Sequence, residues 1–191
     1  MGSKHVRRAV LGKIALLALC LFLGTSCGET DQEPDPLAPP LTVSLQDLFG
    51  SELLKADGTA VGIEAIESKT IVAVFFGAGW CPHCTDFTPI LLSAYESVQL
   101  AGKSFEVVHV SFDDSSEDML AYMSDYSVPW LAVPFGGSVS SALIRRYGVE
   151  SIPTLVVIDR DGNTISLNGR GDVAAKGAAA YDDWLAFSGG S

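Results

Sequence analysis

The chain has 191 residues, of which 48% are hydrophobic and 18% charged, which is typical of one folded domain with a short appendage. Its formal net charge of -11 argues against a nucleic-acid partner, because phosphate binding requires clustered Lys and Arg. An ordinary soluble, self-repelling surface is equally acidic, so the charge indicates little more about function.

Residues 1–26 have the parts of a secretory signal peptide: a basic start, an apolar run at 14–23, and small residues before Cys27. The run is too short for a comfortable membrane span, which needs about 20 apolar residues. Small residues directly before a cysteine resemble a bacterial lipoprotein signal, although Gly24 stands where Leu is usual. We therefore expect lipidation of Cys27 and an extracytoplasmic protein anchored on the periplasmic face of a bacterial membrane. A soluble secreted or periplasmic protein and an uncleaved anchor are the alternatives.

Residues 27–42 include an Asp-, Glu- and Pro-rich segment without hydrophobic periodicity, which predicts a flexible linker. The folded domain is expected at 43–188. Cys20 would be lost with the signal and Cys27 would be blocked by lipid, so Cys81 and Cys84 would remain as the thiols. Two cysteines this close cannot join distant parts of a fold, which excludes a framework of structural disulfides.

Strands and helices alternate along the rest of the chain. Residues 70–76 are apolar on both faces, as a central parallel strand must be, and Asp161-Gly162 is a strong hairpin signal. In the last helix, Trp184 and Phe187 are expected to face the sheet. The order predicts an α/β fold, with a central mixed sheet flanked by helices and an N-terminal hairpin extension. We expect a helical turn and hairpin at 45–58, strands at 70–76, 105–112, 154–158 and 164–167, and helices after Cys81 and at 115–126, 138–147 and 174–187.

The motif Trp80-Cys81-Pro82-His83-Cys84 lies where a strand leads into a helix. A helix N-terminus presents free N–H groups and a partial positive charge, which stabilise a thiolate. Cys81 would attack a substrate disulfide, and Cys84, one turn later, would resolve the mixed disulfide. Pro82 suits the first helical turn, where its missing N–H costs nothing.

The motif also has a possible role in metal binding. A single Cys-x-x-Cys is half a zinc site, but no second cysteine pair exists, and the other histidines are His5 and His109. We therefore expect no metal, and no cofactor besides the redox-active Cys81–Cys84 disulfide. His83 either tunes the thiolate or is only a spacer between the two cysteines.

The Trp-Cys-x-x-Cys motif after an apolar strand, followed much later by Ile152-Pro153-Thr154, resembles the thioredoxin superfamily. An arbitrary X-Pro bond is cis only about 5–6% of the time. The resemblance instead implies that Pro153 is cis and that Ile152 offers its backbone to an extended substrate. Pro89, inside the first long helix, matches a kink proline of the family.

The resemblance is narrower than the superfamily, since several segments over 45–184 are similar to tryparedoxins and nucleoredoxins. It implies that Trp130 borders the active site and contacts substrate; the alternative is a core aromatic residue. The similar segments are 53–58, 75–82, 87–89, 129–135, 152–158 and 168–170.

Two positions depart from the family pattern. Tryparedoxins usually have Cys-Pro-Pro-Cys, whereas His83 makes this motif like that of the periplasmic oxidase DsbA. Thioredoxins proper carry a buried Asp six residues before the nucleophile, where this chain has Phe75. Tryparedoxins lack that Asp too, so activity is not in question, but the base for Cys84 is unidentified.

These observations predict an extracytoplasmic thiol–disulfide oxidoreductase that reduces or isomerises disulfides. A disulfide-forming oxidase is the first alternative, favoured by His83, and a non-catalytic binding or redox-sensor module is the second. The expected partners are disulfide-containing proteins or small thiols and a membrane or periplasmic electron donor, and the protein is expected to be a monomer. A peroxidase is disfavoured, because no separate peroxidatic cysteine survives processing.

Overall fold

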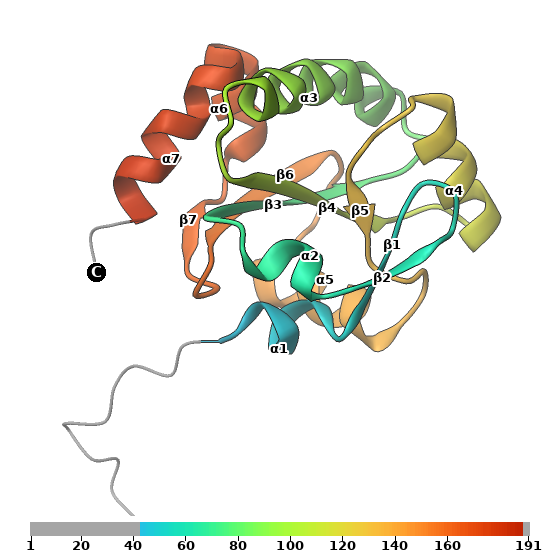
Figure 1. Cartoon of the computed structure of the whole chain (residues 1–191). Helices are drawn as coiled ribbons and strands as arrows, with labels where there is room; N and C mark the ends of the chain where they lie inside the picture. The colour runs from blue at the N-terminus through green and yellow to red at the C-terminus, as the bar shows by residue number, and fades with distance from the viewer. Residues whose placement is uncertain (1–42, 189–191) are drawn as a thin grey trace, which may run out of the picture. The chain divides into compact units, whose positions relative to one another are not determined.

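The computed structural model describes residues 43–188 (Figure 1). The predicted signal peptide, Cys27 and the linker lie outside these residues. The elements in chain order are α1 (Leu45–Phe49), β1 (Glu52–Leu54), β2 (Ala60–Gly62), α2 (Glu64–Glu67), β3 (Ile71–Gly77), α3 (Pro82–Leu100), β4 (Phe105–Ser111), α4 (Ser116–Asp125), β5 (Leu131–Ala132), α5 (Ser138–Tyr147), β6 (Thr154–Asp159), β7 (Thr164–Ser166), α6 (Gly169–Lys176), the 3₁₀ turn η1 (Gly177–Ala179) and α7 (Ala180–Ser188).

The strands form one mixed sheet in the order β2-β1-β5-β4-β3-β6-β7. β3 lies near its centre, parallel to β4 and antiparallel to β6, and β1 and β2 form the expected hairpin at one edge. The mixed sheet flanked by helices confirms the predicted fold class. The short strand β5 and the helix α2 were not predicted, because two to four residues are too few to show a period.

The two faces of the sheet carry separate hydrophobic cores, because successive side chains of a strand point to opposite faces. In β3, Phe75 faces α3, α4, α6 and α7, and its neighbour Phe76 faces α1, α2 and α5. Figure 1 shows these two groups of helices on opposite sides of the sheet. Both phenylalanines are fully buried, so the strand that leads to the cysteine motif is held on both faces.

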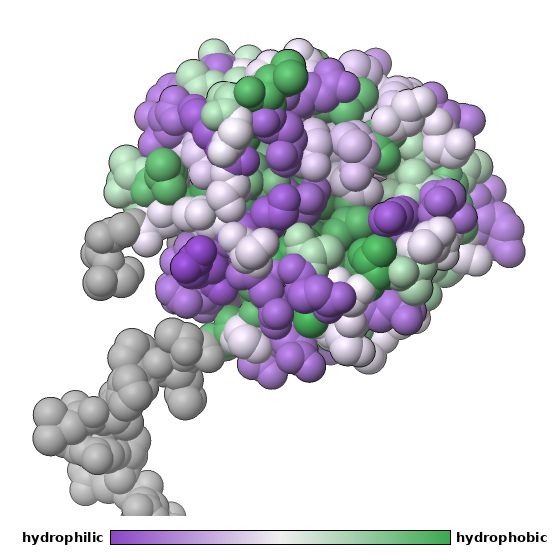
Figure 2. All heavy atoms as spheres, viewed as in Figure 1, coloured by the Kyte–Doolittle hydropathy of each residue, from purple (hydrophilic) through white to green (hydrophobic). Residues whose placement is uncertain are grey.

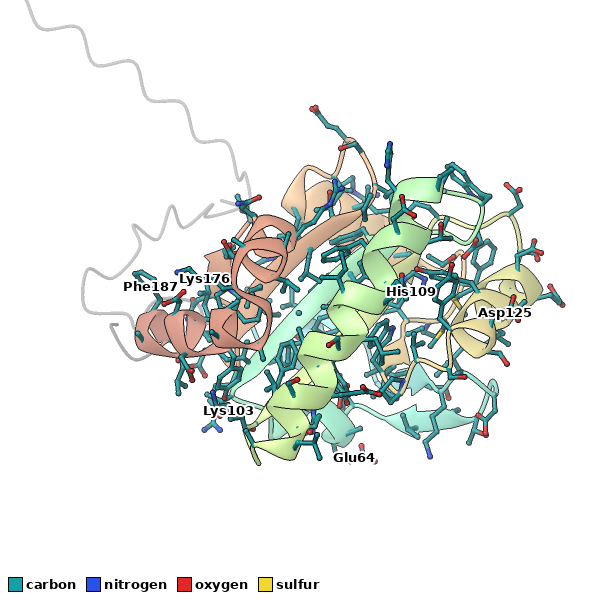
Figure 3. All side chains as sticks on the ribbon, turned by 90° about the horizontal axis from the view of Figure 1, so that it is seen from above. Glu64, Lys103, His109, Asp125, Lys176 and Phe187 are labelled. Atoms are coloured by element: carbon teal, nitrogen blue, oxygen red, sulfur yellow. The ribbon has the colours of Figure 1, made fainter. Side chains whose placement is uncertain are left out.

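The C-terminal helix differs from its prediction. We expected one helix at 174–187, but Gly177 has a φ of +56° and separates α6 from α7. Glycine adopts this conformation without the steric cost that other residues have. Trp184 is buried as expected, whereas the expectation for Phe187 was wrong, since its side chain is 72% exposed on α7 (Figure 3).

The surface in Figure 2 is mainly hydrophilic, with small hydrophobic areas between the polar residues. Among residues 43–188, no helix has both the length and the hydropathy needed to cross a bilayer.

Candidate active site

The strand β3 and the helix α3 meet at the cysteine motif. β3 ends at Gly77, and Cys81 is the N-cap residue of α3, with Pro82 in the first turn as predicted. The backbone N–H of Cys84 donates to the carbonyl oxygen of Cys81 at 3.0 Å, which closes the first turn. The Sγ of Cys81 is therefore attached at the end of α3 where the helix dipole is positive.

The two cysteines are free thiols in different environments. Cys81 is 6% exposed and Cys84 is 0% exposed. Burial, together with a hydrogen bond to Cys81, raises the pKa of Cys84 to about 12, and the positive charge of Arg170 opposes this shift only in part. Cys84 is consequently a protonated thiol at neutral pH, and Cys81 is the more exposed of the two residues.

The peptide bond between Ile152 and Pro153 is cis, as the resemblance implied. The carbonyl oxygen of Ile152 lies 3.9 Å from the Sγ of Cys81, although 71 residues separate the two in the chain. Ile152 also packs against the small cluster formed by Ala78, Cys81 and Cys84. An extended peptide that paired with the backbone of Ile152 would therefore pass directly beside the Cys81 sulfur.

The other residues of the motif are at the surface. Trp80 is 60% exposed, and its Nε1 donates to the carbonyl oxygen of Phe112 at 2.9 Å, which fixes the indole beside Cys81. Pro82 and His83 are both exposed in the first turn of α3. Nothing in this geometry assigns a role to His83 beyond its place between the two cysteines.

The expectation for Trp130 was wrong. Its side chain is 1% exposed and packs edge-on against Phe75 and Tyr95 within the core between the sheet and α3. A substrate cannot reach it there, so Trp130 is a core aromatic residue, which was the alternative stated above. Trp130 directly precedes β5, and the sequence did not indicate which way it faces, because a two-residue strand is too short to show an alternating pattern.

Several polar groups that the sequence did not single out surround the motif. Asp113, just after β4, accepts a hydrogen bond from the backbone N–H of Gly79 at 2.8 Å. Thr88 of α3 donates to the carbonyl oxygen of Cys84 and is also hydrogen-bonded to Tyr122 of α4. His109, on β4 below α3, is fully buried (Figure 3). Asp113, Tyr122 and His109 are distant from the cysteines in the chain, so no local motif indicated them, whereas Thr88 lies one helical turn after Cys84.

An open groove of about 430 Å³ lies beside Trp80. Its walls are mostly acidic and aromatic, and it runs from the residues before Cys81 along α4. The lining residues are Gly79, Trp80, Thr85, Asp113, Asp114, Asp118, Ala121, Tyr122, Asp125 and Tyr126. Among residues 43–188, no group of three or more His, Cys, Asp or Glu side chains is arranged to hold a metal ion.

Comparisons with known proteins agree with this arrangement. A family model described as thioredoxin-like matches residues 69–164. The structure of a thioredoxin from Wuchereria bancrofti is 42% identical, with a TM-score of 0.62, over 73% of this chain and 96% of that one. The chain belongs to the thioredoxin-like family.

Within this thioredoxin-like family, the similarity is to tryparedoxins and nucleoredoxins, as the sequence indicated. A tryparedoxin from Trypanosoma brucei is 37% identical with a TM-score of 0.63, over 71% of this chain and 92% of that one. The nucleoredoxin of Bos taurus is 36% identical over 129 residues, which are 67% of this chain but 29% of that protein. The thioredoxin-like domain thus corresponds to a part of nucleoredoxin and to nearly all of tryparedoxin.

Proposed function

We propose that this protein is an extracytoplasmic thiol–disulfide oxidoreductase that reduces or isomerises disulfides by dithiol exchange. The observation that carries the proposal is the asymmetry of the two thiols. Cys81 is at the helix N-terminus and 6% exposed, whereas Cys84 is fully buried with its pKa raised to about 12. A dithiol exchange needs one sulfur to attack and a second that stays protonated until the mixed disulfide has formed.

The reaction has two steps. The Cys81 thiolate attacks one sulfur of the substrate disulfide, which forms a mixed disulfide and releases the other substrate sulfur as a thiolate. Cys84 then gives up its proton and attacks the Sγ of Cys81, which releases the second substrate sulfur. The substrate gains two electrons and two protons and leaves as two thiols, and Cys81 and Cys84 are left as a disulfide.

The substrate is proposed to dock against Ile152. Its carbonyl oxygen is 3.9 Å from the Cys81 sulfur, and the exposed indole of Trp80 lies on the same approach. An extended segment of a disulfide-containing protein fits this surface, and a small thiol or disulfide would use the part nearest Cys81. Regeneration requires an electron donor, which we propose to be a membrane or periplasmic thiol protein.

The location is proposed from the first 27 residues alone. Their signal-like pattern and Cys27 support a lipid anchor on the periplasmic face of a bacterial membrane. The segment 27–42 would then separate the thioredoxin-like domain from the membrane surface.

A disulfide-forming oxidase is the second candidate, and it is favoured by the sequence of the motif, in which His83 stands where tryparedoxins usually have Pro. Reduction potentials in the superfamily run from about -270 mV for thioredoxin to about -120 mV for DsbA. Equilibration of the full chain with glutathione buffers gives the potential of the Cys81–Cys84 pair. We expect a value nearer the thioredoxin end, and a value near about -120 mV would make the protein an oxidase.

Reduction of insulin disulfides tests the activity itself. The wild type should accelerate the reaction with dithiothreitol as the electron donor, and Cys81→Ser should abolish that acceleration. An inactive wild type would favour a binding or sensor module, and full activity in Cys81→Ser would contradict Cys81 as the nucleophile.

A further inference from the structure

Asp113 lies two residues after the end of β4 and is only 8% exposed. Such burial is unusual for a residue that can carry a charge. A buried carboxylate is costly unless hydrogen bonds or an opposite charge compensate it. Among residues 43–188, Asp113 forms no ion pair, and its oxygens accept from the Gly79 N–H at 2.8 Å and the Ser111 hydroxyl at 2.7 Å. Helix α4 does not need it, because Ser115 caps that helix.

The partner of Asp113 in this arrangement is the peptide that leads into the nucleophile. Gly79 is two residues before Cys81, and a Cβ atom on it would lie 3.1 Å from the Cβ of Tyr122. The Gly79 peptide is thus confined between the Asp113 carboxylate and the Tyr122 side chain. The next residue, Trp80, is bound by the residue that precedes Asp113, because its indole N–H donates to the carbonyl oxygen of Phe112.

We propose that Asp113 is a positioning residue for thiol–disulfide exchange. By accepting the Gly79 N–H, it fixes the Gly79–Trp80 segment, and through that segment it sets where the Cys81 sulfur lies relative to the Ile152 carbonyl. The inference rests on the proposed function for its effect on rate. Asp113 does not touch the reacting sulfur, and a hydrogen bond to a charged acceptor is stronger than one between neutral groups. Small misplacements of a reacting group cause large losses of rate, so the bond matters to chemistry.

Two substitutions at Asp113 separate the loss of its hydrogen bonds from the loss of its charge. In Asp113→Asn, the amide oxygen can accept from Gly79 and the NH₂ can donate to the Ser111 hydroxyl, so both contacts have a replacement. In Asp113→Ala, both contacts are lost. Asp114→Ala is the matched control, because Asp114 is the next residue, carries the same charge and is exposed.

Three measurements on the full chain test the inference: amide hydrogen exchange at Gly79, alkylation of Cys81 at fixed pH, and kcat/KM for insulin reduction. In Asp113→Ala, we expect exchange at Gly79 to be at least about tenfold faster, the alkylation rate of Cys81 to change, and kcat/KM to fall about tenfold. Asp113→Asn should stay within about threefold of wild type in kcat/KM, and Asp114→Ala within about twofold.

Three results would overturn the inference: unchanged Gly79 exchange in Asp113→Ala, faster exchange without any loss of kcat/KM, or an Asp113→Asn variant as slow as Asp113→Ala although Gly79 stays protected. If Asp113→Ala does not fold, Ser111→Ala removes the second support of the carboxylate and should give a smaller change in the same direction. An unchanged Gly79 exchange in that variant would then count against the inference. If the wild type reduces no disulfide, the proposed function fails, but Gly79 exchange and Cys81 alkylation still test the positioning.

Discussion

Phe75 and His109 lie opposite each other on the neighbouring strands β3 and β4, and the Nδ1 of His109 is 3.2 Å from the carbonyl oxygen of Phe75. Phe75 occupies the position where thioredoxins proper have a buried acid. The adjacent strand instead places a buried imidazole beside it, whose ring centre lies 5.3 Å from that of Phe75 and 5.6 Å from that of Tyr122, with both ring pairs tilted. Burial lowers the pKa of His109 to about 4, and its Nε2 has no hydrogen-bond partner within residues 43–188.

This buried histidine should make the folded state sensitive to acid. The pKa of His109 is about 6.5 when unfolded and about 4 when folded, so the unfolded state binds the extra proton between these values. The contribution of His109 to stability therefore falls as the pH drops from 6.5 to 4, by up to about 3 kcal/mol.

Urea unfolding of the wild type and of His109→Phe at pH 7 and pH 4.5 measures that contribution. The free energy of unfolding should fall more steeply with acid in the wild type than in the variant. Equal falls in both proteins would show that the folded state does not lower the pKa of His109.

The different environments of the two cysteines predict selective alkylation. At pH 7.5, iodoacetamide should modify Cys81 and leave Cys84 unmodified, because burial keeps the pKa of Cys84 near 12. Both cysteines lie in the single tryptic peptide 70–103, so fragmentation of that peptide in the mass spectrometer locates the modified sulfur. The same reaction in 8 M urea, where both should react, is the control. Equal rates at Cys81 and Cys84 in the folded protein would contradict the asymmetry.

His83 is expected to make the Cys81–Cys84 pair more oxidising, if its partial charge stabilises the neighbouring thiolate. Replacing it in His83→Pro, the residue found in tryparedoxins, should shift the reduction potential to a more negative value. The shift is about 30 mV for each 1.4 kcal/mol of thiolate stabilisation lost. His83→Gln, which removes the charge but keeps a polar side chain, should shift the potential in the same direction. An unchanged potential in both variants would make His83 a spacer and remove the support for an oxidase.

The proposed lipid anchor predicts a covalent modification at Cys27. Cells grown with a radioactive fatty acid should label the wild type and not Cys27→Ala. Gly28 follows where an Asp would favour retention in an inner membrane, so in a two-membrane cell we expect the outer membrane. An unlabelled, soluble mature protein would show that Gly24 prevents recognition as a lipoprotein signal.

The local features of the site could be predicted from the chain, and the features that arise from packing could not. The strand–helix junction at Cys81 and the hairpin at Asp161-Gly162 depend on neighbouring residues, so the periodicity and turn residues indicated them. The cis bond at Pro153 came from the family resemblance alone. The hydrogen bond between Asp113 and Gly79 joins residues 34 positions apart, and no local pattern contains it.

The errors have the same physical origin. Trp130 was placed at the active site by its sequence neighbourhood, but the core below α3 buries it against Phe75. Phe187 has the spacing of a core residue, three positions after the buried Trp184 in α7, but it lies in the last turn of that helix and is 72% exposed. In both cases, tertiary packing determined a position that the pattern along the chain left undetermined.

The most direct test of the proposed mechanism is to identify which sulfur joins the substrate. In Cys84→Ser, the second step is blocked, so incubation with a disulfide-bonded peptide should trap a mixed disulfide that dithiothreitol releases. Mass spectrometry of the trapped species should find the peptide on Cys81, and Cys81→Ser should trap none under the same conditions. A peptide joined to Cys84 in Cys81→Ser at a comparable rate, or no mixed disulfide in Cys84→Ser, would contradict Cys81 as the nucleophile.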